Sequence, residues 1–140
     1  MKWYLASRTR HQKKLIKISR FLEDVGETVN SDWIYKGDMK PFLENLEMVQ
    51  ELAEHNTKKI LDADVFIAFN DLDGTDLFSE FGVALGKKAK SNNIKIYIIG
   101  DKAKASLMQL YPGVIHVEKF SDILPKEGLT ESINFDHDFS

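Results

Sequence analysis

Short apolar runs of strand length, separated by segments with helical periodicity, constrain the fold more than any other feature of this sequence. The runs 64–69 and 94–99 are almost continuously apolar, which is typical of parallel strands that helices cover on both faces. Further strands are expected over 2–6, 28–34 and 114–117. The sequence therefore predicts five strands.

Between these runs, apolar residues recur at spacings of three and four, as they do on one face of a helix. This periodicity predicts helices over about 9–27, 41–61 and 76–90, and shorter helical segments over 103–111 and 120–124. Strands that alternate with helices form βαβ units and a parallel sheet. We expect an α/β protein: a single flavodoxin/Rossmann-like domain with a five-stranded parallel sheet in the order 2-1-3-4-5 and helices on both faces.

The chain has 140 residues, the length of one domain, which we place at 1–125 with a C-terminal tail over 126–140. It contains no cysteine, which excludes disulfide scaffolds, cysteine-ligated metals and thiol nucleophiles and favours a reducing, cytoplasmic location. Its apolar runs are too short for a membrane span or a signal peptide, and its four histidines show no metal-ligand spacing. We expect no metal, no cofactor and no membrane partner.

Positive charge is concentrated in the first 20 residues, which hold seven lysines and arginines and no acid. Such a stretch either attracts phosphate or forms the solvated face of one helix. The net charge of the whole chain is −3, which argues against binding to a nucleic-acid polymer.

In a sheet of order 2-1-3-4-5, ligands bind beyond the carboxyl ends of the first and third strands. The loops to consider are therefore 7–10 and 70–75, and the second leads into a helix that carries Glu80. Glu80 lies about 60° from Leu77, at the edge of the apolar arc of that helix, where its carboxylate can face the crevice. Alternatively, Glu80 is a solvated residue and the acids of 71–76 only cap the helix start.

The loop before the first helix and one tryptophan are further candidates for contact with a ligand. Ser7, Arg8 and Thr9 precede the first helix, where backbone N–H groups favour an anion such as a 5′-phosphate; the other interpretation makes Arg8 and Arg10 ordinary surface arginines. Trp33 is placed either to stack on a base or to pack in the core.

The apolar strand 64–69, the Gly74-Thr75 pair and the segment 80–85 (EFGVAL) resemble the signature of the nucleoside 2-deoxyribosyltransferase family. That superfamily also includes the 2′-deoxynucleoside 5′-phosphate N-hydrolases. The first strand, with Tyr4 and the small-residue turn that follows it, is similar to the family's first strand, and Trp33 also has a counterpart in relatives. The resemblance extends over about 2–100.

The resemblance implies roles for the matching residues. Glu80 would be the nucleophile that attacks C1′ of the sugar, and Tyr4 would orient its carboxylate. Asp71 or Asp73 would be the acid that handles the leaving base. Asn56 stands where the transferases usually carry an aspartate, a difference that weakens the case for base exchange. The substrate-binding residues expected from the resemblance or from their position are Ser7, Arg8, Thr9, Trp33, Asn56, Gly74 and Thr75.

The expected function is cleavage or exchange of the N-glycosidic bond of (2′-deoxy)nucleosides or their 5′-monophosphates in nucleotide salvage. A glutamate nucleophile serves both hydrolysis and transfer. The alternative is a non-catalytic nucleotide-binding domain on the same fold. The resemblance also implies a homodimer or larger homo-oligomer, because relatives complete their sites across a subunit interface. The long second helix offers Phe42, Leu46 and Val49 for such a contact.

Overall fold

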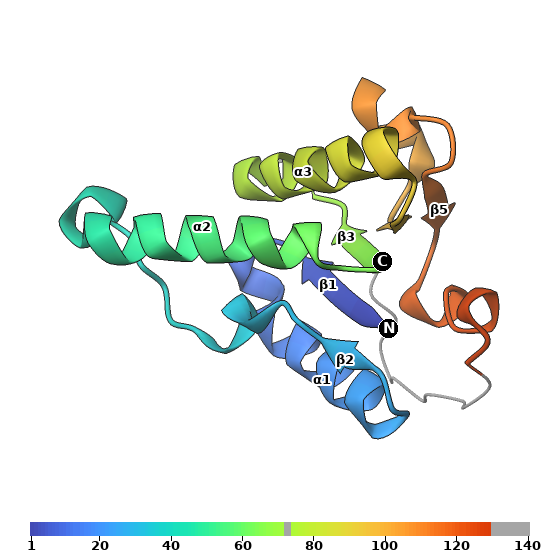
Figure 1. Ribbon diagram of the computed structural model, residues 1–140, viewed down its shortest axis with the longest axis horizontal. Helices are drawn as coiled ribbons and strands as arrows, with labels where there is room; N and C mark the ends of the chain where they lie inside the picture. Colours follow the sequence, from blue (N-terminus) through green and yellow to red (C-terminus); the bar gives the residue numbers. More distant parts are fainter. Residues whose placement is uncertain (72–73, 130–140) are drawn as a thin grey trace.

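The computed structural model describes residues 1–71 and 74–129. Within these ranges, five parallel strands form a sheet in the order β2-β1-β3-β4-β5 (Figure 1). This order confirms the predicted α/β fold. The strands are β1 (Lys2–Ala6), β2 (Thr28–Val29), β3 (Val65–Phe69), β4 (Lys95–Ile99) and β5 (Ile115–Val117).

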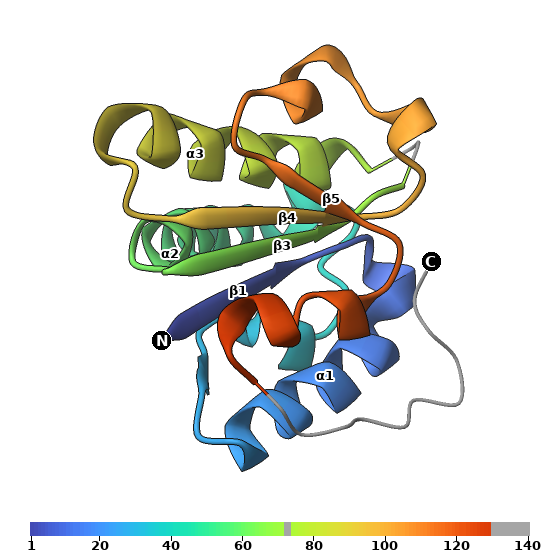
Figure 2. The same cartoon turned by 90° about the vertical axis from the view of Figure 1, so that its right-hand side faces the viewer.

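Helices cover both faces of the sheet, with α1 on one face and α2 and α3 on the other (Figure 2). Their bounds are α1 (Gln12–Asp24), α2 (Leu46–Leu61) and α3 (Thr75–Ser91). The alternation of side chains along β1 separates the two layers. Trp3 and Leu5 pack with α1, whereas Tyr4 and Ala6 pack with α2 and α3. Tyr4 therefore lies on the same side of the sheet as Glu80, which α3 carries.

The second strand is much shorter than predicted, and residues 32–35 form a 3₁₀ turn instead. Side chains replace the backbone ladder at this point. The Leu5 N–H donates to Ser31 Oγ at 2.9 Å, and the Trp33 indole N–H donates to the Leu5 carbonyl at 2.8 Å. Because both polar groups of Leu5 have partners, the edge of β1 needs no further strand residues.

Several helices begin later than predicted or are divided into shorter turns. Short 3₁₀ turns at 9–11 and 42–45 precede α1 and α2. The predicted helix over 103–111 is two separate 3₁₀ turns, 102–104 and 107–110, because Ser106 breaks the run and caps the second turn. The predicted turn over 120–124 is a 3₁₀ turn over 120–122.

Residues 126–129, the first part of the expected tail, are packed on the domain. The Glu127 side chain is almost fully buried, accepts a hydrogen bond from the Tyr97 hydroxyl and pairs with Lys95 Nζ at 2.9 Å. Leu129 packs against the core on the α1 side. The remainder of the expected tail, 130–140, lies outside the described residues.

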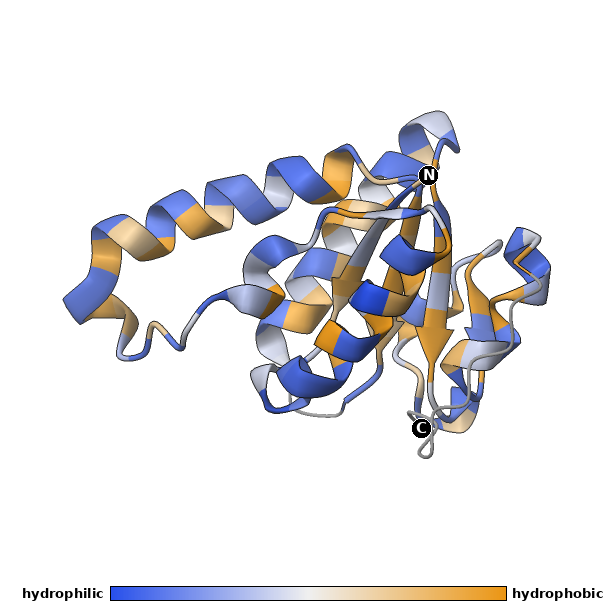
Figure 3. Ribbon diagram, turned by 90° about the horizontal axis from the view of Figure 1, so that it is seen from below, coloured by the Kyte–Doolittle hydropathy of each residue, from blue (hydrophilic) through white to orange (hydrophobic). Residues whose placement is uncertain are grey.

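The first half of α2 extends beyond the body of the domain (Figures 1 and 3). Apolar side chains on and just before this half are exposed to solvent, with Leu43 at 85%, Met48 at 57% and Leu46 at 47%. Within the described ranges, every helix is too short or too polar to cross a bilayer.

Candidate active site

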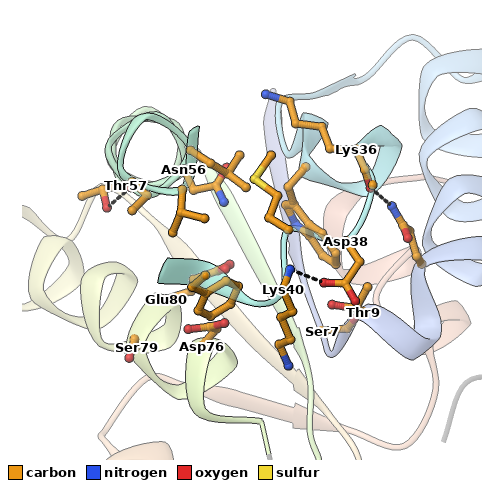
Figure 4. A pocket seen from close by; sticks show the side chains of 18 of the residues that line it. Ser7, Thr9, Lys36, Asp38, Lys40, Asn56, Thr57, Asp76, Ser79 and Glu80 are labelled. Atoms are coloured by element: carbon orange, nitrogen blue, oxygen red, sulfur yellow. Dashed lines mark hydrogen bonds between the residues drawn. The ribbon is translucent and has the colours of Figure 1, made fainter. Parts of the chain in front are cut away.

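A pocket of about 310 Å³ lies beyond the carboxyl ends of β1 and β3, where the sheet order predicts a ligand. Its walls come from the loop after β1, the connection 36–42, α2 and α3 (Figure 4). Polar side chains on the α2 and α3 walls face an opposite wall of polar side chains and two lysines. The apolar part of the lining includes Trp33, Met39, Phe42, Val49, Leu52 and Val83.

Glu80 points into this pocket from α3 (Figure 4). Its side chain is partly exposed, but Oε2 is buried and has no hydrogen-bond partner among the described residues. The pKa of Glu80 is raised from 4.5 to about 7. Burial is the main cause, the Tyr4 hydroxyl opposes it, and the charge of Asp76 adds to it. The Glu80 carboxyl is therefore near its titration midpoint at neutral pH.

Tyr4 lies behind Glu80 in the core. Its ring is fully buried and stacks on Phe66, with ring centroids 5.7 Å apart and planes 6° apart. Burial raises the pKa of the Tyr4 hydroxyl far above its ordinary value, and the Glu80 charge adds to this effect. The hydroxyl therefore stays protonated, and it is close enough to stabilise the Glu80 carboxylate. Because the hydroxyl has no partner at ordinary hydrogen-bond geometry among the described residues, its contact with the Glu80 carboxyl is loose.

Asp71, one of the two candidates for the second acid, faces the loop after β1 instead of the pocket. It accepts a hydrogen bond from Arg10 and lies 3.7 Å from Arg8 Nη1 and 3.6 Å from His11 Nε2. Its side chain is only 7% exposed. A carboxylate held among these basic groups is a structural bridge between β3 and the start of α1. The other candidate, Asp73, lies outside the described residues.

The side chains of the predicted anion-binding loop point in two different directions. Ser7 and Thr9 line the pocket, whereas Arg8 extends toward Asp71. Arg8 also packs closely on Gly74. A Cβ at position 74 would lie 3.2 Å from Arg8 Cγ and 3.0 Å from Leu77 Cβ. The predicted glycine at the start of α3 therefore allows close packing, and among the described residues the pocket lining includes neither Gly74 nor Thr75.

Trp33 and Asn56 both line the pocket. The Trp33 side chain also packs against both core clusters, as one of the two interpretations expects, and its stacking on a base stays a prediction. Asn56 Oδ1 is buried and has no hydrogen-bond partner among the described residues. It offers an acceptor for a hydroxyl or amino group of a ligand.

Sequence reasoning missed several residues that line the pocket. Asp76 and Ser79 lie within one turn of Glu80 on α3, and the i,i+4 spacing of Asp76 and Glu80 was visible in the sequence. The connection 36–42 adds Lys36, Asp38 and Lys40. Nothing in its composition signalled this role, because the fold alone brings the connection over the ends of β1 and β3.

Comparisons with known proteins identify the fold. No protein-family model matches the chain, and no curated protein matches it. Among solved structures, it is similar to the CMP N-glycosidase BcmB of Clostridium botulinum, with a TM-score of 0.60 and 20% sequence identity. The similarity covers 91% of this chain and 98% of that chain. The two chains share a fold.

The pocket of this chain holds a distinct set of chemical groups. Within 1–71 and 74–129, no three histidine, aspartate or glutamate side chains gather as metal ligands would. The pocket instead combines a carboxyl with a buried oxygen, a protonated hydroxyl behind it, a buried amide oxygen and a second carboxylate nearer to solvent. Such groups can stabilise or bond to a carbon that becomes positively charged, and they can hold the hydroxyls of a sugar.

Proposed function

We propose that this protein cleaves the N-glycosidic bond of nucleosides or their 5′-monophosphates, with Glu80 as the nucleophile. The observation that carries the proposal is the Glu80 carboxyl, which lines the pocket, has a buried oxygen and interacts with the Tyr4 hydroxyl. The similar solved structure, a CMP N-glycosidase, supports the same class of bond. A nucleoside or nucleotide is also a ligand of suitable size for a pocket of about 310 Å³.

In the first step, a Glu80 carboxylate oxygen attacks C1′ of the sugar. The bond from C1′ to the base nitrogen breaks, its electron pair goes to the base, and the base takes a proton from solvent. Positive charge develops on the sugar in the transition state, so a carboxylate beside C1′ stabilises it. The product is a sugar bound through an ester to Glu80.

Tyr4 is a positioning residue in this mechanism. Its hydroxyl stays protonated, so it donates toward the carboxylate and keeps part of the Glu80 population ionised despite burial. Because only the ionised carboxylate attacks, base release should rise with pH through about 7 and then level off.

The other side chains that line the pocket would hold the rest of the substrate. Trp33 and Phe42 offer aromatic surface to the base, and the Asn56 amide oxygen accepts from a sugar hydroxyl or an amino group. A 5′-phosphate would lie toward Ser7 and Thr9 at the start of the first helix.

The test is incubation of the protein with a panel of ribonucleosides, deoxynucleosides and their 5′-monophosphates, followed by chromatography of the released bases. A free base should appear from at least one member of the panel. Isothermal titration with the same compounds provides the second measurement. A protein that binds members of the panel but releases no base from any of them would be a binding module, and the proposal would be wrong.

A further inference from the structure

Asp76 is the carboxylate of the pocket that neither the sequence motif nor the fold comparison assigns a role. It lies one turn before Glu80 on α3, at the i,i+4 spacing that places two side chains on the same helical face. Both side chains line the pocket (Figure 4). The Asp76 charge raises the pKa of Glu80, which shows that the two carboxyl groups are close enough to interact.

The two carboxyl groups differ in their surroundings. The Glu80 carboxyl has a buried oxygen and interacts with Tyr4, whereas Asp76 is exposed in the first turn of α3. Among the described residues, Asp76 has no hydrogen bond or ion pair, so its oxygens are available to water at the open side of the pocket.

The other acids near the site have other partners. Asp71 is held by Arg8, Arg10 and His11. Asp38 lies on the opposite wall, where its Oδ1 accepts from the Lys40 backbone N–H at 3.0 Å. Among the described carboxylates that line the pocket, Asp76 is therefore the one beside Glu80 that can accept a proton from water.

We propose that Asp76 is the general base of a second, hydrolytic step, an inference that rests on the proposed glycosidase function. Asp76 takes a proton from a water molecule while the water oxygen bonds to C1′. The bond from C1′ to Glu80 breaks, and its electron pair returns to the Glu80 carboxylate. The products are the free sugar and a protonated Asp76, which then loses its proton to solvent. The protein is in this account a hydrolase.

The test uses Asp76→Asn, which keeps the shape of the side chain but cannot accept the proton. The first step does not need Asp76, so this variant should release about one equivalent of base per site in a burst. Its steady-state turnover should then be lower than that of wild type by a factor of at least about 100, the usual effect of losing a general base. Intact-protein mass spectrometry should detect the added sugar, and digestion should place it on the peptide that contains Glu80.

Azide gives a second measurement, because it attacks C1′ without losing a proton. Sodium azide should restore the turnover of Asp76→Asn and yield a glycosyl azide, while changing wild-type turnover little. The matched control is Asp24→Asn, which neutralises an exposed aspartate at the far end of α1. It should behave as wild type, and equal melting temperatures would show that both variants fold. Asp76→Ser is a second variant with the same expected burst.

The outcomes separate this inference from the proposed function. Wild-type turnover in Asp76→Asn would overturn the inference and leave the glycosidase function intact. A loss of turnover without a burst, an adduct or azide rescue would also overturn it, because Asp76 would then act in binding or in the first step. A wild-type protein that releases no base would refute the proposed function itself, and the inference would fall with it.

Discussion

Glu80→Gln should stabilise the protein at alkaline pH but not at acid pH. The Glu80 pKa is raised from 4.5 to about 7 in the folded protein. A carboxyl with a raised pKa binds its proton more tightly when folded, so stability is lost as pH rises from the unfolded value through the folded one. The loss is complete above about pH 7 and amounts to at most about 3 kcal/mol at 1.36 kcal/mol per unit.

Glutamine resembles the neutral acid and never ionises, so the variant avoids this loss. At pH 8.5 its melting temperature should exceed that of wild type by roughly 6–12 °C, since 1 kcal/mol shifts a domain of this size by about 2–4 °C. At pH 4 the two proteins should melt together. Thermal denaturation followed by circular dichroism is the assay, with the exposed Glu23→Gln on α1 as the control. An equal difference at both pH values would refute the reasoning.

Three further predictions concern turnover and assembly. Tyr4→Phe removes the group that lowers the Glu80 pKa, so the midpoint of the pH–rate profile should move up by about one unit and base release at pH 7 should fall about fivefold; a uniform loss at every pH would contradict this role. The exposed Leu43 and Leu46 beside the free end of α2 predict a homodimer or larger, and Leu46→Glu should reduce the mass measured by light scattering at micromolar concentration; a monomeric wild type would count against it. Thr9→Ala, on the wall where a 5′-phosphate would lie, should raise KM for 5′-monophosphates and spare nucleosides, and an equal effect on both would contradict that placement.

The sheet was predictable because its strands are covered on both faces. Runs such as 64–69 and 94–99 are almost entirely apolar, and a strand with one face in water would leave about half of these side chains exposed. The second strand was predicted too long, because it ends where the Leu5 N–H donates to Ser31 Oγ and the Trp33 indole N–H donates to the Leu5 carbonyl. Those bonds join residues 26 and 28 positions apart in the chain, which local patterns do not reveal.

The candidate site was predictable where it depends on helical geometry or on a motif. The angular position of Glu80 placed it at the edge of its helix, and the resemblance placed Tyr4 beside it; the structure brings the two together. The sequence left Asp71 and Asp73 as equal candidates, since their spacing does not show that Asp71 pairs with the basic loop. The functional roles of these residues stay predictions.

The most direct test of the central claim is base release by Glu80→Ala on the best substrate of the panel. Glu80 acts mainly in the transition state, so the variant should bind that substrate with similar affinity by isothermal titration and release no measurable base. Comparable binding together with a complete loss of release is the predicted result. Release of base by Glu80→Ala at the wild-type rate would contradict the account, because the attacking group would then lie elsewhere.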